Sequence, residues 1–245
     1  MLPYLFEFGP IKISSFGFFV AVSFILASFW LWKELKEEYV EEDILTLTID
    51  LFLASLLGAR LIYLIENLSV FWFYPLRWLL WGKYPGFSLL GAVLAGLLFT
   101  KFWTKRKNWD WWLIGDKGLV VFLAVQITGG IGLFLSTAST LELSKILLMV
   151  AGLIICLFNQ KHYRKFLWYK SGKVGFVTAT GFAYFFLMMA GLEFIFQSGI
   201  YWERYAYLLL FFFSLILFYK RSERNFRQDF KIFSFKKDEK TKTIS

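Results

Sequence analysis

The sequence contains only one cysteine, Cys156, and only one histidine, His162. An internal disulfide is therefore impossible, because a second thiol is missing. A metal site would lack a second soft ligand, and a histidine-based triad would depend on a residue that lies in a basic loop. We accordingly expect neither a metal ion nor another cofactor, and these scarcities leave no obvious catalytic residue.

Charged residues are also scarce, at 18% of the chain, whereas hydrophobic residues make up 58% and aromatic residues 22%. A soluble globular domain is usually about 45–50% apolar. The excess lies in continuously apolar runs, each close to the roughly 20 residues with which a helix crosses a bilayer. Helices, unlike single strands, satisfy all their own backbone groups in lipid. The predicted fold class is an all-α integral membrane protein with seven transmembrane helices, at residues 14–33, 44–66, 86–104, 112–135, 139–158, 175–198 and 204–220.

The distribution of basic residues predicts how these helices are oriented. Loops on one side of the membrane carry 20 Lys and Arg residues, and loops on the other side carry five. The basic loops are 33–43, 101–111, 159–174 and 220–245. By the positive-inside rule these loops face the cytoplasm. The C-terminus is then cytoplasmic and the N-terminus lies outside.

We divide the chain into a transmembrane domain, residues 1–220, and a basic cytoplasmic tail, residues 221–245. The first span is expected to serve as the insertion signal, with no removable signal peptide before it. The aromatic segment 70–84 is expected to lie on the outer membrane surface, with a structural loop lid as the alternative. The tail is expected to rest on anionic lipid, and nucleic acid is not an expected partner.

The most unusual charge is Arg60, which lies inside the apolar run from Leu51 to Leu68. Placing a guanidinium group in hydrocarbon costs roughly 2.5–3.5 kcal/mol or more. An arginine kept there is a candidate for a functional site, with neighbouring carboxylates or an anionic ligand as its partner. The alternative is that Arg60 extends to the headgroups, since it lies near one end of the span.

Polar residues of other spans fall at the predicted depth of Arg60. Tyr63 follows it on the same span, Ser88 and Gln126 lie on the third and fourth spans, and Glu193 lies on the sixth. We therefore predict a site for a lipid headgroup in the outer leaflet, formed by Arg60, Tyr63, Ser88, Gln126 and Glu193. Arg60 and Glu193 are expected to pair directly or through the headgroup, because unpaired charges are costly there.

Asp116 and Lys117 lie apart from this group, near the inner end of the fourth predicted span. Charged residues within a span are typical of ion and proton pathways. This pair is the one feature of the sequence that favours a small transporter or channel.

Five segments of the sequence carry a resemblance to a known family. They are GPIKISSFGFF (9–19), GARLIYLIEN (58–67), YPGFSLLGAVLAG (84–96), GGIGLFL (129–135) and GLEFIF (191–196). In this order they resemble the bacterial phosphatidylglycerol–prolipoprotein diacylglyceryl transferases over nearly the whole chain, and Asp116 and Gln126 also fall where related sequences carry those residues. The resemblance implies a seven-helix protein of the bacterial plasma membrane. It also implies transfer of the diacylglyceryl group of phosphatidylglycerol to the thiol of a prolipoprotein lipobox cysteine, with glycerol phosphate as the leaving group.

The chain departs from the family at five positions where the family carries reactive or polar side chains. These are Phe16 for tyrosine, Leu90 for histidine, Gly130 and Met189 for arginine, and Leu133 for asparagine. Two functions are then open. The chain is either a divergent transferase, in which Arg60 binds the phosphate and Glu193 positions it, or a catalytically silent paralogue that binds anionic phospholipid or a lipoprotein precursor.

Overall fold

The computed structural model describes residues 2–8, 11–71, 86–166, 169, 171–197 and 201–223. Most of these residues belong to long helices. The long helices are α1 (Ser15–Leu35), α2 (Glu41–Glu66), α4 (Leu89–Lys107), α5 (Trp111–Thr137), α6 (Thr140–His162), α7 (Phe176–Phe196) and α8 (Tyr201–Arg221). The shorter elements are the strands β1 (Tyr4–Phe8) and β2 (Ile11–Ser14), the helix α3 (Leu68–Phe71) and the 3-10 turn η2 (Tyr163–Lys165).

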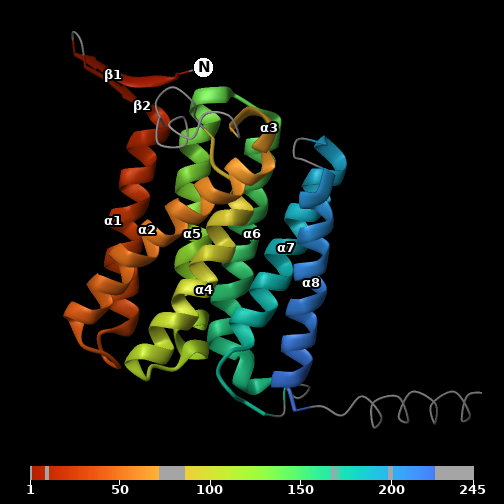
Figure 1. Ribbon diagram of the computed structural model, residues 1–245. Helices are drawn as coiled ribbons and strands as arrows, with labels where there is room; N and C mark the ends of the chain where they lie inside the picture. Colours follow the sequence, from red (N-terminus) through yellow and green to blue (C-terminus); the bar gives the residue numbers. More distant parts are fainter. Residues whose placement is uncertain are drawn as a thin grey trace, which may run out of the picture.

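The long helices stand side by side in one bundle, and successive long helices run in opposite directions (Figure 1). The β1–β2 hairpin lies at one end of the bundle, which we call the hairpin end, and α8 finishes at the opposite end. Helix α2 packs along α4, α1 along α5, and α7 along α8. Which end of the bundle faces outward stays a prediction.

Six of the long helices are apolar and long enough to cross a membrane, all except α4. Helix α4 carries four basic residues in its last seven, so every 18-residue stretch of it contains at least three Lys or Arg. The structure therefore confirms an all-α membrane protein, whereas the count of seven spans stays a prediction.

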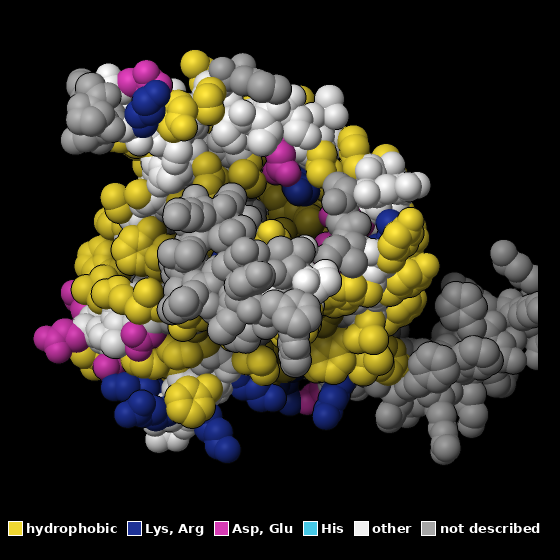
Figure 2. Space-filling view, turned by 45° about the horizontal axis from the view of Figure 1, so that its top comes forward, with side chains coloured by type: hydrophobic (Ala, Val, Ile, Leu, Met, Phe, Trp, Pro, Cys, Tyr) yellow, Lys and Arg dark blue, Asp and Glu magenta, His cyan; other side chains and the backbone are white. Residues whose placement is uncertain are grey.

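Large apolar side chains cover the outside of the bundle. Ile25, Leu98 and Leu209 are each about two-thirds exposed, and Figure 2 shows hydrophobic side chains over much of the visible flank. Contiguous apolar surface of this kind suits contact with lipid acyl chains rather than water. Helix α7 is the most enclosed span, and its Phe185 and Met189 lie in the main hydrophobic core.

The N-terminal hairpin is not part of the predicted all-α fold. Strands β1 and β2 pair antiparallel, with Tyr4 opposite Ser14. The backbone N–H of Leu2 donates to the carbonyl of Leu135 at 2.8 Å, and the Ser15 hydroxyl donates to the carbonyl of Leu2. These bonds attach the hairpin to the start of α1 and the end of α5.

Glycines allow α2 and α4 to approach closely near the hairpin end. A Cβ atom on Gly58 would lie 2.1 Å from the Cβ of Ala95 and 2.8 Å from the carbonyl oxygen of Gly91. Gly58→Ala should therefore destabilise the bundle by about 1–3 kcal/mol, as overpacking does, seen as a lower thermal midpoint in detergent. Gly118→Ala on α5 is the matched control, because nothing lies within 4 Å of its added Cβ. Equal midpoints for the two variants would contradict the close approach.

Two predicted segments fall mostly outside the described residues. Of the predicted interfacial segment 70–84, only its first two residues are described, and they belong to α3. Of the predicted tail 221–245, the structure describes residues 221–223.

Candidate functional site

Arg60 lies near the end of α2, at the hairpin end of the bundle, and only 4% of its surface is exposed. Its Nη1 donates a hydrogen bond to the carbonyl of Gly86 at 3.0 Å. Its guanidinium carbon lies 5.5 Å from the ring centre of Tyr63 and 5.7 Å from that of Phe71. Aromatic faces at such distances stabilise a cation. The alternative in which Arg60 extends to the headgroups is wrong, since protein encloses its guanidinium group.

Gly86 makes this enclosure possible. Its backbone has a φ of +157°, and a Cβ atom there would lie 2.1 Å from the ring of Tyr63. The absence of a side chain thus lets Tyr63 pack directly on the backbone whose carbonyl holds Arg60. Tyr63, a predicted site residue, is confirmed as a neighbour of Arg60.

Ser88 connects three elements at this end of the bundle. It is the N-cap of α4, and its hydroxyl accepts from the backbone N–H of Gly91 at 3.4 Å. Its backbone N–H donates to the carbonyl of Ala59 on α2 at 3.0 Å. The same hydroxyl lies 3.3 Å from Oε1 of Glu66 and 3.4 Å from Oε1 of Glu203, and it donates to this pair. Ser88 therefore brings together a carboxylate from the end of α2 and one from the first turn of α8.

Glu193 lies on α7 and is 6% exposed. The predicted pairing of Arg60 with Glu193, directly or through a bound headgroup, stays a prediction. Tyr207 on α8 lies within electrostatic range of Glu203, Glu193 and Glu66.

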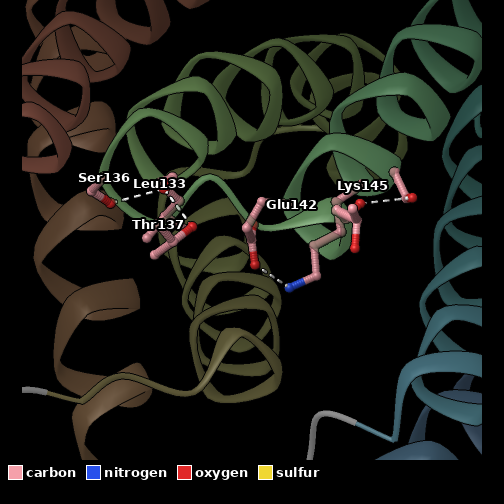
Figure 3. Close-up of polar contacts among 7 residues, drawn as sticks. Leu133, Ser136, Thr137, Glu142 and Lys145 are labelled. Carbon is pink, nitrogen blue, oxygen red and sulfur yellow. Dashed lines mark hydrogen bonds and ion pairs between the residues drawn. The ribbon is translucent and has the colours of Figure 1, made fainter. Parts of the chain in front are cut away.

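A second cation, Lys145, lies at the hairpin end, in the first turns of α6. Its Nζ is 2.9 Å from Oε1 of Glu142. Figure 3 shows both side chains extending from the start of α6 into the space between neighbouring helices. Figure 2, turned toward the hairpin end, shows a hollow with a hydrophobic floor and with acidic and basic side chains at its margin.

The other polar residues of the predicted spans do not join this group. Gln126 is half-buried on α5, and its side chain forms no hydrogen bond with the residues that the structure describes. Asp116 accepts hydrogen bonds from the start of α7, and Lys117 pairs with Glu34 of α1 at 2.5 Å. Asp116 and Lys117 therefore hold helices together, and neither lies at the hairpin end.

The arrangement offers a buried cation and several carboxylates within one end of an apolar bundle. A guanidinium group in this setting is suited to a phosphate, and paired carboxylates are suited to accepting a proton. No group of three or more potential metal-ligating side chains occurs in the described part of the chain. Fold and site together define an integral membrane protein with a charged, largely enclosed site at one membrane face.

Comparison with known proteins identifies the family to which this membrane protein belongs. The sequence model of the prolipoprotein diacylglyceryl transferase family matches residues 3–235. The chain therefore belongs to the prolipoprotein diacylglyceryl transferase family, as its motifs predicted.

Individual relatives match over shorter stretches. The phosphatidylglycerol–prolipoprotein diacylglyceryl transferase of Caldanaerobacter subterraneus subsp. tengcongensis is 33% identical over 108 residues, which cover 43% of this chain and 42% of the relative. The protein of the same name from Clostridium tetani is 30% identical over 137 residues, covering 56% of this chain and 54% of the relative. The chain thus spans about half the length of the curated relatives that it matches.

Proposed function

We propose that this protein transfers the diacylglyceryl group of phosphatidylglycerol to the thiol of a prolipoprotein lipobox cysteine, at the outer face of a bacterial plasma membrane. The observation that carries the proposal is the enclosed guanidinium group of Arg60 at the hairpin end. A buried cation there is suited to the phosphate of an anionic phospholipid. Family membership over residues 3–235 supports the same reaction.

In this reaction Arg60 neutralises the charge that develops on the departing glycerol phosphate. Electrostatic stabilisation of such charge is usually the largest single contribution to a transfer reaction. Tyr63 and Gly86 hold the guanidinium in place through ring packing and a backbone hydrogen bond. Ser88 and Glu193 complete the headgroup site that we propose, with Glu193 positioning the phosphate.

A second function, binding without catalysis, is favoured by a specific observation. Leu90 and Met189, which stand where the family carries histidine and arginine, are almost completely buried and lie in one hydrophobic core. A Cβ atom on Gly130, at the second arginine position, would lie 3.0 Å from the side chain of Ile146. These positions are thus packed with apolar groups, as in a silent paralogue that binds anionic phospholipid or a lipoprotein precursor.

Complementation distinguishes the two functions. A bacterium depleted of its own transferase should resume lipidation of its precursors when it expresses this protein. Lipidation is measured by incorporation of labelled fatty acid into a reporter lipoprotein. Membrane insertion of the protein without lipidation would contradict the transferase and support the binding function.

A further inference from the structure

Arg204 is a cation in the first turn of α8, at the hairpin end of the bundle, to which the proposed function assigns no role. Its guanidinium carbon lies 5.1 Å from the ring centre of Tyr201 and 5.4 Å from that of Phe194 on α7. Both rings are exposed on the flank of the bundle. Arg204 is therefore held between α7 and α8 at the outer surface, and not in the enclosed site of Arg60.

The guanidinium group of Arg204 has no hydrogen-bond acceptor among the residues that the structure describes. Its Nε is buried without a partner, and the group forms no ion pair with a described carboxylate. The acid next to it in the chain, Glu203, lies at the Ser88 hydroxyl instead. Because a buried donor normally has an acceptor, Arg204 is suited to an anion that the described chain does not supply.

An exposed apolar stripe runs down α8 from the ring that packs on Arg204. Its members follow one another at intervals of three or four residues, which places them on one face of the helix. Each is at least 59% exposed, and they are Tyr201, Tyr205, Leu209, Phe212 and Ile216. From residue 205 to residue 216 the stripe is about 16 Å long at a rise of 1.5 Å per residue. This length is about half of the roughly 30 Å hydrocarbon core, or one leaflet.

A phospholipid has the two parts that this surface requires. Its phosphate oxygens match the N–H groups of a guanidinium, and its acyl chains suit a contiguous apolar surface. The exposed rings of Tyr201 and Trp202 at the start of the stripe are typical of the headgroup level of a membrane. An anionic headgroup is favoured over a zwitterionic one, because the latter would bring a second cation close to Arg204.

We propose that Arg204 and the apolar stripe form a second lipid-binding surface, which holds an anionic phospholipid of the leaflet at the hairpin end. The phosphate contacts Arg204, and an acyl chain lies along the stripe. This surface is separate from the headgroup site at Arg60. It goes beyond the proposed function, because it binds lipid without transferring it and serves a transferase and a silent paralogue alike.

The test uses the full-length protein in phosphatidylcholine nanodiscs that contain a small fraction of a photoactivatable lipid. Photoactivatable phosphatidylglycerol and phosphatidylcholine with identical acyl chains are compared, and labelled peptides are identified by mass spectrometry. Phosphatidylglycerol should label the segment 205–216 about tenfold more than phosphatidylcholine, as expected for one charge-assisted contact. Arg204→Gln should reduce this label to the phosphatidylcholine level, and Arg204→Lys, which keeps the charge, should retain part of it.

Arg164→Gln is the matched control, because Arg164 also lies over an aromatic ring, that of Tyr163, but at the opposite end of the bundle. It should leave the labelling unchanged. Arg60→Ala should leave it unchanged as well, since the two lipid sites are separate. Loss of the α8 label in Arg60→Ala would show that the label reports lipid bound at Arg60, and would overturn the second surface.

Thermal midpoints in detergent show that each variant is folded. Equal labelling by the two lipids, or an undiminished preference for phosphatidylglycerol in folded Arg204→Gln, would overturn the proposal. Absence of label from both lipids would overturn it too, because another protein segment, such as a second copy of this chain, would then cover the stripe. None of these outcomes depends on diacylglyceryl transfer, so they leave the proposed function to its own test.

Discussion

Arg60→Ala should lower the rate of diacylglyceryl transfer by about 10²–10³-fold or more, the loss typical of removing one group that stabilises transition-state charge. The guanidinium is 4% exposed and is held in place by the carbonyl of Gly86 and the ring of Tyr63. The measurement is the initial rate of lipidation of a lipobox peptide in phosphatidylglycerol vesicles.

In the same assay, Arg60→Lys tests whether the positive charge alone is sufficient or the planar guanidinium group is also needed. Lysine keeps the positive charge but lacks the planar fork that contacts a phosphate through two N–H groups and stacks on rings. It should recover only part of the rate. Arg106→Ala is the control, since Arg106 is exposed in the last turn of α4, at the opposite end of the bundle.

The fold of the variants must be checked separately, because Arg60→Ala also removes a hydrogen-bond donor from the carbonyl of Gly86. Thermal midpoints in detergent, with and without added phosphatidylglycerol, serve this purpose. A folded Arg60→Ala protein with a normal transfer rate would show that the phosphate is bound elsewhere. Loss of lipid-induced stabilisation together with loss of transfer supports the headgroup site.

Six of the predicted spans agree with helices that are long and apolar enough to cross a membrane, because apolar runs of helix length are a local property of the sequence. Arg60 was recognised for the same reason, since a guanidinium inside such a run has few acceptable environments. Ser88 and Tyr63 were placed near Arg60 by depth, and the structure confirms both as neighbours of the same segment around Gly86.

Depth alone did not predict which helices are neighbours. The sequence analysis singles out neither Glu203 nor Lys145, yet the first turns of α8 and α6 bring them to the hairpin end. Gln126 has a suitable depth but lies on α5 without a polar contact to the group. Which helices pack side by side depends on contacts between small residues, such as Gly58 of α2 against Ala95 of α4. A single sequence does not show which glycines lie at such contacts.

Asp116 is a second case in which the position of a polar residue within a span did not predict its role. A charged residue within a predicted span favoured a transporter or channel, but its carboxylate is fully used in building the fold. Oδ2 accepts from the backbone N–H of Gly175 at 2.6 Å, and Oδ1 accepts from the N–H and hydroxyl of Thr178 at 2.7 and 2.6 Å. Asp116 of α5 thus supplies the cap that α7 lacks in its own sequence, since its N-cap residue is a glycine.

Asp116→Ala should consequently lower the free energy of unfolding by about 2–5 kcal/mol, because the buried N–H groups of Gly175 and Thr178 lose their acceptor at about 1–3 kcal/mol each. The carboxylate is 6% exposed, so water does not replace it at the N–H groups of Gly175 and Thr178. The measurement is denaturant unfolding in mixed micelles. Asp116→Asn should lose less, because its one carbonyl oxygen still accepts from Thr178 while its amide N–H₂ faces the N–H of Gly175.

Asp110→Ala is the matched control for Asp116→Ala. Asp110 caps α5 by accepting from the N–H of Trp112 at 2.9 Å, but at an exposed position. Its loss should cost only about 1 kcal/mol, as for an ordinary N-cap. Equal losses at the two positions would contradict the cross-helix role of Asp116. If Asp116→Ala is much less stable but still binds phosphatidylglycerol at low temperature, Asp116 stabilises α7 and is not part of the lipid site at the hairpin end.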